Sequence, residues 1–128
     1  LTKIGSNYYL YNYDNFFKVD FLKRDILSWF KLLESKGFGE IFINFANKDG
    51  TFKGYEIEMI ETVVESLDIP VTVCGGCSNF EDIYNLANTT SVSGIAAGSV
   101  FVYRNSNKGV LISYPDIEEI DSRISKHG

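Results

Sequence analysis

The sequence has few cysteines, no long apolar run and no excess of basic residues, and each shortage excludes a class of protein. Two cysteines with no secretion signal indicate reduced thiols in a cytoplasmic protein, not a disulfide scaffold. No apolar run approaches the ~20 residues of a membrane span. A net charge of −5 argues against nucleic acid as the main partner, because a phosphate backbone needs a basic face. The chain starts at Leu1 instead of methionine, which indicates a processed or truncated protein.

Apolar runs separated by helical patterns organise the rest of the chain. With 128 residues, 45% of them hydrophobic, one domain over residues 1–128 is expected. The runs "EIFINFA", "IPVTVC" and "VSGIAAG" do not alternate with polar residues, and a helical or turn-forming segment follows each. Buried strands that alternate with helices predict parallel βαβ units, and therefore an α/β fold.

Two further elements precede the strand–helix units. Tyr9, Tyr11 and Tyr13 fall on one face of an extended segment, which predicts a two-stranded ribbon over residues 6–21. "LKRDILSWFKLLESKG" then has helical spacing and ends at Gly37. Three parallel strands cannot close a barrel, so the fold is either a small three-layer sandwich or part of something larger.

Small residues follow all three predicted strands, in "NFANKDGT", "CGGCSN" and "AAGSVF". The carboxyl ends of parallel strands meet at one edge of a sheet, where ligands of α/β proteins bind. Glycine there lets backbone N–H groups approach an anion closely. The three loops together predict a phosphate site with Gly75, Gly76, Gly98 and Ser99 as donors.

Cys74 and Cys77 form a C-x-x-C pair at a predicted strand-to-helix junction, the position of a thioredoxin-like redox pair. Pro115 stands about as far downstream as the proline of that fold, but a predicted helix follows it instead of strands. The simpler interpretation is that Cys74 fills a buried strand end and Cys77 a small position at the helix start. A zinc site needs about four ligands, and His127 is the one histidine, so no metal is expected.

The motifs "GFGEIFINFANKDGTFKGYEIEMI", "IPVTVCGG" and "AAGSVF" resemble, in order and spacing, the C-terminal half of the imidazole glycerol phosphate synthase cyclase subunit, the partner of a glutamine amidotransferase. The resemblance covers about residues 5 to 127. The stretch "VYRNSNKGVLISYP" is more similar to the variant found among bacterial surface-polysaccharide genes than to the histidine-pathway form.

This resemblance implies half of a (βα)8 barrel: strands six to eight and the ribbon that follows strand five. In the family, ammonia from the glutaminase attacks a phosphorylated ribulosyl substrate, and the cyclase, a lyase, closes an imidazole ring in histidine biosynthesis. No cofactor is implied. The matching motifs assign one substrate phosphate to Asn44, Gly76, Gly98 and Ser99, with Gly75 shaping the turn. They assign the active-site face to Asn47, Asp49, Gly50 and Thr51.

The departures from the family pattern bear on catalysis. The family uses two aspartates, from strands one and five, as general acid and base, and the resemblance places both outside this chain. Asn47 replaces an acid, Asn44 a more usual threonine and Gly98 an alanine. An amide can hydrogen-bond but cannot act as a base. The chain alone is therefore expected to bind phosphate and do little chemistry.

Two alternatives and one partner expectation remain. The chain could be a stand-alone module for phosphate binding or assembly, or a redox protein that uses Cys74 and Cys77. The sequence does not choose between a histidine precursor and sugar amidation in polysaccharide synthesis as the pathway. Because a half barrel exposes strand edges and barrel-facing side chains, we expect self-association or pairing with a missing half.

Overall fold

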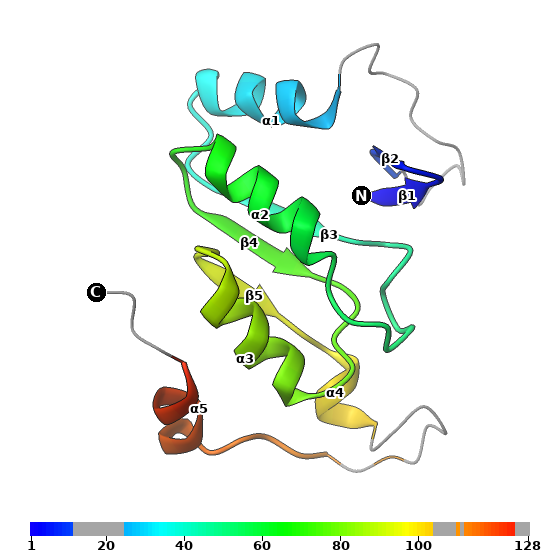
Figure 1. Ribbon diagram of the computed structural model, residues 1–128, viewed down its shortest axis with the longest axis vertical. Coiled ribbons are helices and arrows are strands. Elements are labelled where there is room, and N and C mark those ends of the chain that lie inside the picture. Colours follow the sequence, from blue (N-terminus) through cyan, green and yellow to red (C-terminus); the bar gives the residue numbers. More distant parts are fainter. Residues whose placement is uncertain (12–24, 104–109, 111, 125–128) are drawn as a thin grey trace.

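The computed structural model describes residues 1–11, 25–103, 110 and 112–124. Within these residues, five short strands and five helices follow each other (Figure 1). They are β1 (Thr2–Ile4), β2 (Asn7–Tyr9), α1 (Ile26–Ser35), β3 (Ile41–Asn44), α2 (Ile57–Ser66), β4 (Val71–Cys74), α3 (Phe80–Thr89), β5 (Gly94–Ala96), α4 (Ser99–Val102) and α5 (Ile117–Arg123).

The centre of the fold is a parallel sheet in the order β3-β4-β5. In register, Ile43 lies beside Val73, and Val73 beside Ile95. Each crossover carries a helix, α2 between the first two strands and α3 between the last two. The predicted α/β class and the predicted parallel βαβ units are confirmed.

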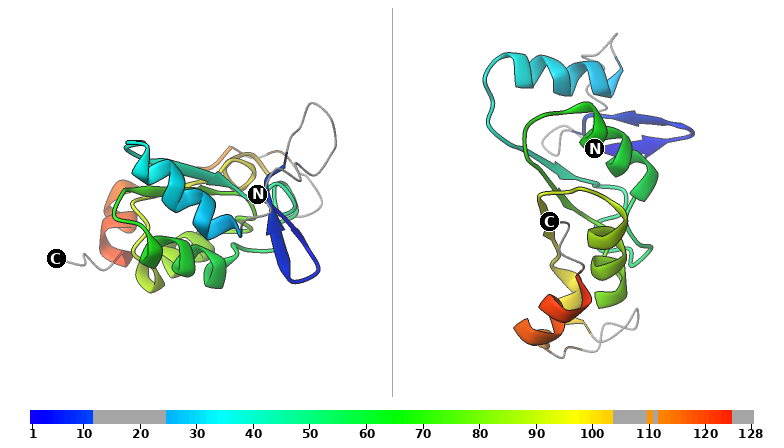
Figure 2. Two further views of the ribbon diagram at one scale, coloured as in Figure 1. Left: turned by 90° about the horizontal axis from the view of Figure 1, so that it is seen from above. Right: turned by 60° about the vertical axis from the view of Figure 1, so that its left-hand side comes forward.

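The helices cover one face of this sheet (Figure 2). Side chains of α1, α2 and α3 form one buried core with Ile41, Ile43, Val71 and Val73. The strand residue between the first two, Phe42, is 60% exposed. Burial therefore alternates along β3, and the exposed face fits the expectation that a half barrel exposes its barrel-facing side chains. One-sided cover by the described helices is the arrangement of a barrel wall, not of a three-layer sandwich.

Caps and glycines set the ends of the helices. The Asp25 carboxylate accepts from the Ser28 N–H at 2.9 Å and begins α1. Gly37, at φ +86°, follows its last turn, as predicted. α5 lies against α3, where the Asn88 amide donates to the Arg123 carbonyl at 2.9 Å. None of the helices in the described part of the chain is long and apolar enough to cross a bilayer.

The N-terminal residues form an antiparallel hairpin that pairs Thr2 with Tyr9. The ribbon predicted over residues 6–21 overlaps this hairpin at β2, and residues 12–21 lie outside the described part. The hairpin lies beside the end of β3. The Ala46 N–H donates to the Leu1 carbonyl at 2.7 Å, and the Leu1 nitrogen donates to the Asn44 carbonyl at 2.5 Å. These two bonds have the pattern of a parallel ladder, so Leu1 extends the sheet beyond β3.

Candidate functional site

The three strand-end loops converge on one small pocket. Six of the nine predicted site residues line it, namely Asp49, Gly50, Gly75, Gly76, Gly98 and Ser99, together with Cys74, Cys77 and Ala97. The loops are far apart in sequence and meet because the parallel register puts their strand ends at the same edge. The pocket holds about 10 Å³, which is room for about one water molecule. A phosphate would therefore lie across its mouth.

Three predicted site residues do not line this pocket. The Asn44 amide oxygen lies beneath the Gly75 turn, 2.9 Å from where a Cβ at Gly75 would be. The Asn47 side chain accepts from the Lys3 N–H at 3.3 Å and is turned toward the hairpin. The Thr51 hydroxyl donates to the Lys48 carbonyl at 2.7 Å, within its own loop. These residues shape the loops around the pocket.

Gly75 and Gly76 form the floor of the pocket and have φ of +100° and +108°, a region that favours glycine. A Cβ at Gly75 would lie 2.7 Å from the Phe45 carbonyl oxygen. A Cβ at Gly76 would overlap the Gly54 carbonyl, and the Gly54 N–H donates to the Gly76 carbonyl at 2.8 Å. Both positions therefore require glycine, for conformation and for space.

The two helices that begin beside the pocket, α3 and α4, differ in how the N–H groups of their first turns are hydrogen-bonded. At α3, Asp82 accepts from the Ser78 N–H at 2.7 Å, and Asn79 caps the Asp82 N–H at 3.2 Å. Side chains of the chain itself thus satisfy the start of α3. Ser99 is the first residue of α4, where an N–H has no partner inside the helix. Gly98 precedes it with open space around its Cα.

Burial raises the pKa of both thiols next to the pocket. The pKa of Cys77 rises to about 11, chiefly because the side chain is buried. Cys74 is half-buried, and its pKa is raised by burial and then by the nearby Asp49 carboxylate. Both are free cysteines. The burial predicted for Cys74 is only partial, whereas Cys77, predicted as a small residue at the helix start, is buried. A redox pair requires a stabilised thiolate, so these shifts oppose the redox alternative.

A charged cluster centred on Glu56 joins the hairpin to the loop between β3 and α2. The Glu56 carboxylate accepts from the Tyr8 hydroxyl at 2.8 Å and pairs with Lys3 at 3.2 Å and Lys48 at 3.4 Å. Burial opposes its charge, but the hydrogen bonds of Tyr8 and Lys3 and the lysine charges hold the pKa of Glu56 below its usual value. Sequence reasoning missed this cluster, because Lys3 and Glu56 are far apart in the chain.

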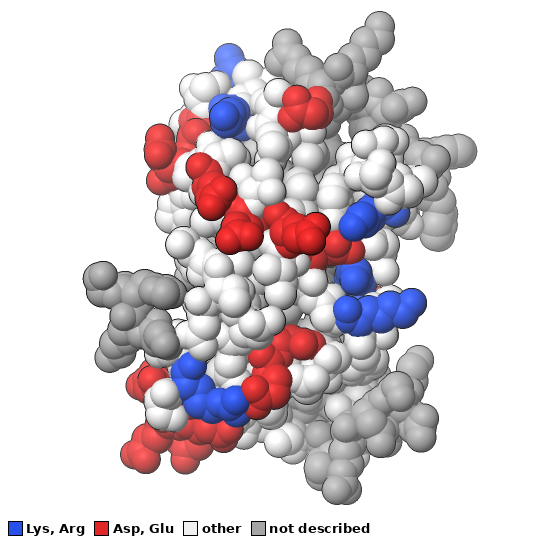
Figure 3. Space-filling view, in the orientation of Figure 1, with Lys and Arg blue, Asp and Glu red and all other residues white. Residues whose placement is uncertain are grey.

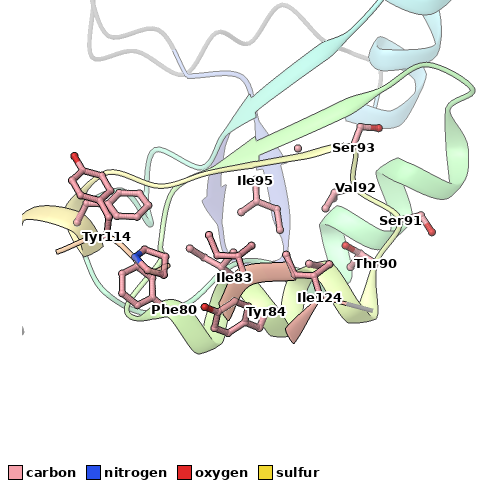
Figure 4. A pocket seen from close by; sticks show the side chains of 15 residues that line it. Phe80, Ile83, Tyr84, Thr90, Ser91, Val92, Ser93, Ile95, Tyr114 and Ile124 are labelled. Carbon is pink, nitrogen blue, oxygen red and sulfur yellow. The ribbon is translucent and has the colours of Figure 1, made fainter. Parts of the chain in front are cut away.

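A larger cavity of about 900 Å³ lies elsewhere, between α3, β5 and α5 (Figure 4). Its walls are mainly apolar and include Phe80, Ile83, Ile95 and Ile124. The Tyr84 hydroxyl is its one buried polar atom without a partner among the described residues. The cavity contains none of the predicted site residues, and its lining carries no charged group among the described side chains. We therefore place the candidate site at the strand ends.

The described residues contain no group of three or more His, Cys, Asp or Glu side chains that could hold a metal ion. Asp49 is the carboxylate that lines the strand-end pocket. Backbone groups and the Ser99 hydroxyl are the hydrogen-bonding groups that the rest of the lining can offer to a ligand.

Comparison with known proteins identifies the family. The profile described as "Histidine biosynthesis protein" matches residues 20–107. The chain belongs to this family. It is 41% identical over 100 residues to the "Putative imidazole glycerol phosphate synthase subunit hisF2" of Pseudomonas aeruginosa, an overlap of 78% of this chain and 40% of that protein. It is 35% identical over 79 residues to the imidazole glycerol phosphate synthase subunit HisF of Streptococcus mutans, covering 62% of this chain and 32% of that one.

Family membership confirms the predicted resemblance to the synthase's cyclase subunit and, with the parallel sheet, the predicted partial (βα)8 barrel. The chain spans less than half the length of these relatives, 40% of one and 32% of the other. The residues that match the family profile include β3, β4, β5 and the three loops that form the pocket.

The glycine floor yields a first prediction. Gly76→Ala should destabilise the fold by about 2–4 kcal/mol, because alanine is strained at positive φ and meets the Gly54 carbonyl. Gly98→Ala is the matched control, and it should change stability by less than about 1 kcal/mol, because its Cβ meets open space. Urea unfolding measures both, and equal losses would contradict the described geometry.

The buried thiol yields a second prediction. In a Cys74→Ser background, alkylation of Cys77 by iodoacetamide should keep accelerating from about pH 8 to about pH 10, because the thiolate is the reactive form and the pKa lies near 11. Mass spectrometry of timed samples gives the rate. A plateau below about pH 8.5 would instead reveal a stabilised thiolate and revive the redox alternative.

Proposed function

We propose that the chain is the C-terminal half of a cyclase subunit of the imidazole glycerol phosphate synthase type, and that its strand-end pocket binds a phosphate group of a phosphorylated sugar. One observation carries the proposal. Three glycine-containing loops, separated along the chain, meet in one pocket, which Gly50 lines from the first loop, Gly75 and Gly76 from the second, and Gly98 and Ser99 from the third. Phosphate oxygens are bound by backbone N–H groups, which glycines at strand ends and the first turn of a helix leave accessible.

The half-barrel part of the proposal is supported by the two outer edges of the sheet and by the greater length of the relatives. Leu1 hydrogen-bonds along the outer edge of β3 in a parallel pattern, where a further barrel strand would run. The opposite edge of the sheet is β5, which pairs with β4. The relatives match this chain over 40% or less of their length. Residues 1–128 are accordingly proposed to be one half-barrel domain.

The proposal also includes the source of the ammonia and the expectation that this chain alone does not catalyse ring closure. By family resemblance, ammonia comes from a glutaminase partner in the cytoplasm, for a histidine precursor or for a related sugar amidation in polysaccharide synthesis. Ring closure moves protons on and off the substrate and needs an acid and a base. The pocket offers Asp49 as its carboxylate, and Asn47 is an amide turned toward the hairpin. We therefore propose phosphate binding, without catalysis, for this chain alone.

Calorimetric titration with inorganic phosphate and with a sugar bisphosphate tests the phosphate site. The wild-type chain should bind with saturation at millimolar ligand. Gly98→Asp should weaken binding by at least about tenfold, because it puts a second carboxylate in the pocket. Ser99→Ala should weaken it less, through loss of one hydroxyl donor.

Gly39→Asp is the matched control. It makes the same charge change on the segment that leads into β3, at the opposite end of the strands, where an added Cβ meets nothing within 4 Å. It should leave the affinity unchanged. Equal weakening by both aspartate variants would show that the change in net charge alone causes the effect. The phosphate site would be contradicted if the wild type did not bind at millimolar ligand. In that case the chain would be better described as an assembly module.

Association is the second part of the proposal. The face of the sheet opposite the helices exposes Phe42 at 60%, and a barrel would enclose this face. We propose that the chain covers it by pairing with itself or with a complementary half barrel.

The corresponding measurement is light scattering at increasing concentration. The average mass of the wild type should rise above that of one chain, and Phe42→Asp should hold it at one chain, because a charge cannot be buried unpaired. Phe38→Asp is the control, since Phe38 is 54% exposed but precedes the sheet. A wild type that stays monomeric at high concentration would contradict the association.

A further inference from the structure

The strand-end pocket lacks a positive charge of its own. Asp49 contributes a carboxylate to it, and the remaining described lining residues are neutral. A bound phosphate would therefore meet a like charge, which opposes binding. Backbone N–H groups offset part of that repulsion. Anion binding beside Asp49 calls for a cation close to the pocket.

Lys48 is a lysine whose Cβ lies beside the Gly76 turn that lines the pocket. Its Cβ lies 3.2 Å from where a Cβ at Gly76 would be, so the side chain leaves the loop directly beside the glycine turn. The side chain is 21% exposed. Lysine carries its charge on a flexible four-carbon stem and binds phosphate as a movable point charge. Figure 3 shows basic side chains gathered on the side of the molecule that carries the hairpin and the strand-end loops.

Glu56 now holds that ammonium, but loosely. The Lys48–Glu56 distance is 3.4 Å, whereas a close charge-assisted bond measures about 2.7–2.9 Å. The same carboxylate is also paired with Lys3 at 3.2 Å and accepts from the Tyr8 hydroxyl at 2.8 Å. If Lys48 moves away, Glu56 keeps two partners and is not left as an uncompensated charge. The cluster can release one lysine at little cost.

We propose that Lys48 is the cationic ligand of the phosphate bound at the strand-end pocket, and that Glu56 is a positioning residue that competes with this phosphate for the Lys48 ammonium. The inference rests on the proposed phosphate site and adds its counter-ion and its regulation. Glu56 keeps Lys48 next to the pocket and sets how strongly an anion must attract it. The affinity for phosphate therefore depends on the difference in free energy between two ion pairs of Lys48, one with the phosphate and one with Glu56.

The two residues have opposite predicted effects, and calorimetric titration with inorganic phosphate at constant ionic strength measures both. Lys48→Met should lower the affinity by about tenfold, and Lys48→Arg should retain most of it. Glu56→Gln should raise the affinity by about threefold, because the neutral amide still accepts from Tyr8 but no longer competes for Lys48. The gain should disappear in a Lys48→Met background; a gain that persists there would come from loss of the Glu56 charge itself and would overturn the competition.

Lys53→Met is the matched control, because Lys53 is an exposed lysine of the same loop and its loss changes the net charge equally. It should leave the affinity within about twofold of the wild type. Wild-type binding that Lys48→Met does not weaken, or that Lys53→Met weakens equally, would overturn the role of Lys48 and leave the phosphate site standing. A loss of affinity in Glu56→Gln would overturn the competition. No binding by the wild type would overturn both the site and this inference.

Discussion

The close approach of backbone to backbone at Gly75 and Gly76 is the constraint on which the rest of the site depends. The turn after β4 passes within contact distance of the Phe45 and Gly54 carbonyls, at φ values that glycine tolerates. A side chain there would push the loops after β3 and β4 apart. With glycine, the loops meet and the backbone stays open to a ligand, so folding and binding impose the same requirement on these two residues.

The charges around the pocket are less fixed than the pocket's shape. The backbone floor is fixed by the parallel register, whereas the charges of Asp49, Lys48 and Glu56 are carried by side chains of one loop and can rearrange. The hairpin contributes Lys3 and Tyr8 to the same cluster. It thereby ties the first residues of the chain to the loop that borders the pocket. Under the proposal, phosphate binding and the docking of the hairpin are linked through Glu56.

The sequence predicted the parts of this arrangement that local pattern determines. Apolar runs followed by helical spacing predicted the parallel sheet, and small residues after the strands together with the family motif predicted six of the nine residues that line the pocket. The directions of Asn44, Asn47 and Thr51 could not be predicted, because partners in the hairpin and the loop backbone set them. The exposure of Phe42 depends on which face the helices cover, and the Glu56 cluster joins residues too distant in sequence for any spacing rule.

The proposed site requires that backbone amides of two separate loops, after β4 and after β5, bind one phosphate. Nitrogen–proton correlation spectra of the labelled chain, recorded during a phosphate titration, test it most directly. The amide signals of Gly75, Gly76, Gly98 and Ser99 should shift together along one saturable curve, while those of Gly37 and Gly39, at the other end of the sheet, stay in place. Shifts confined to one loop, or spread over both ends of the sheet, would contradict a shared site.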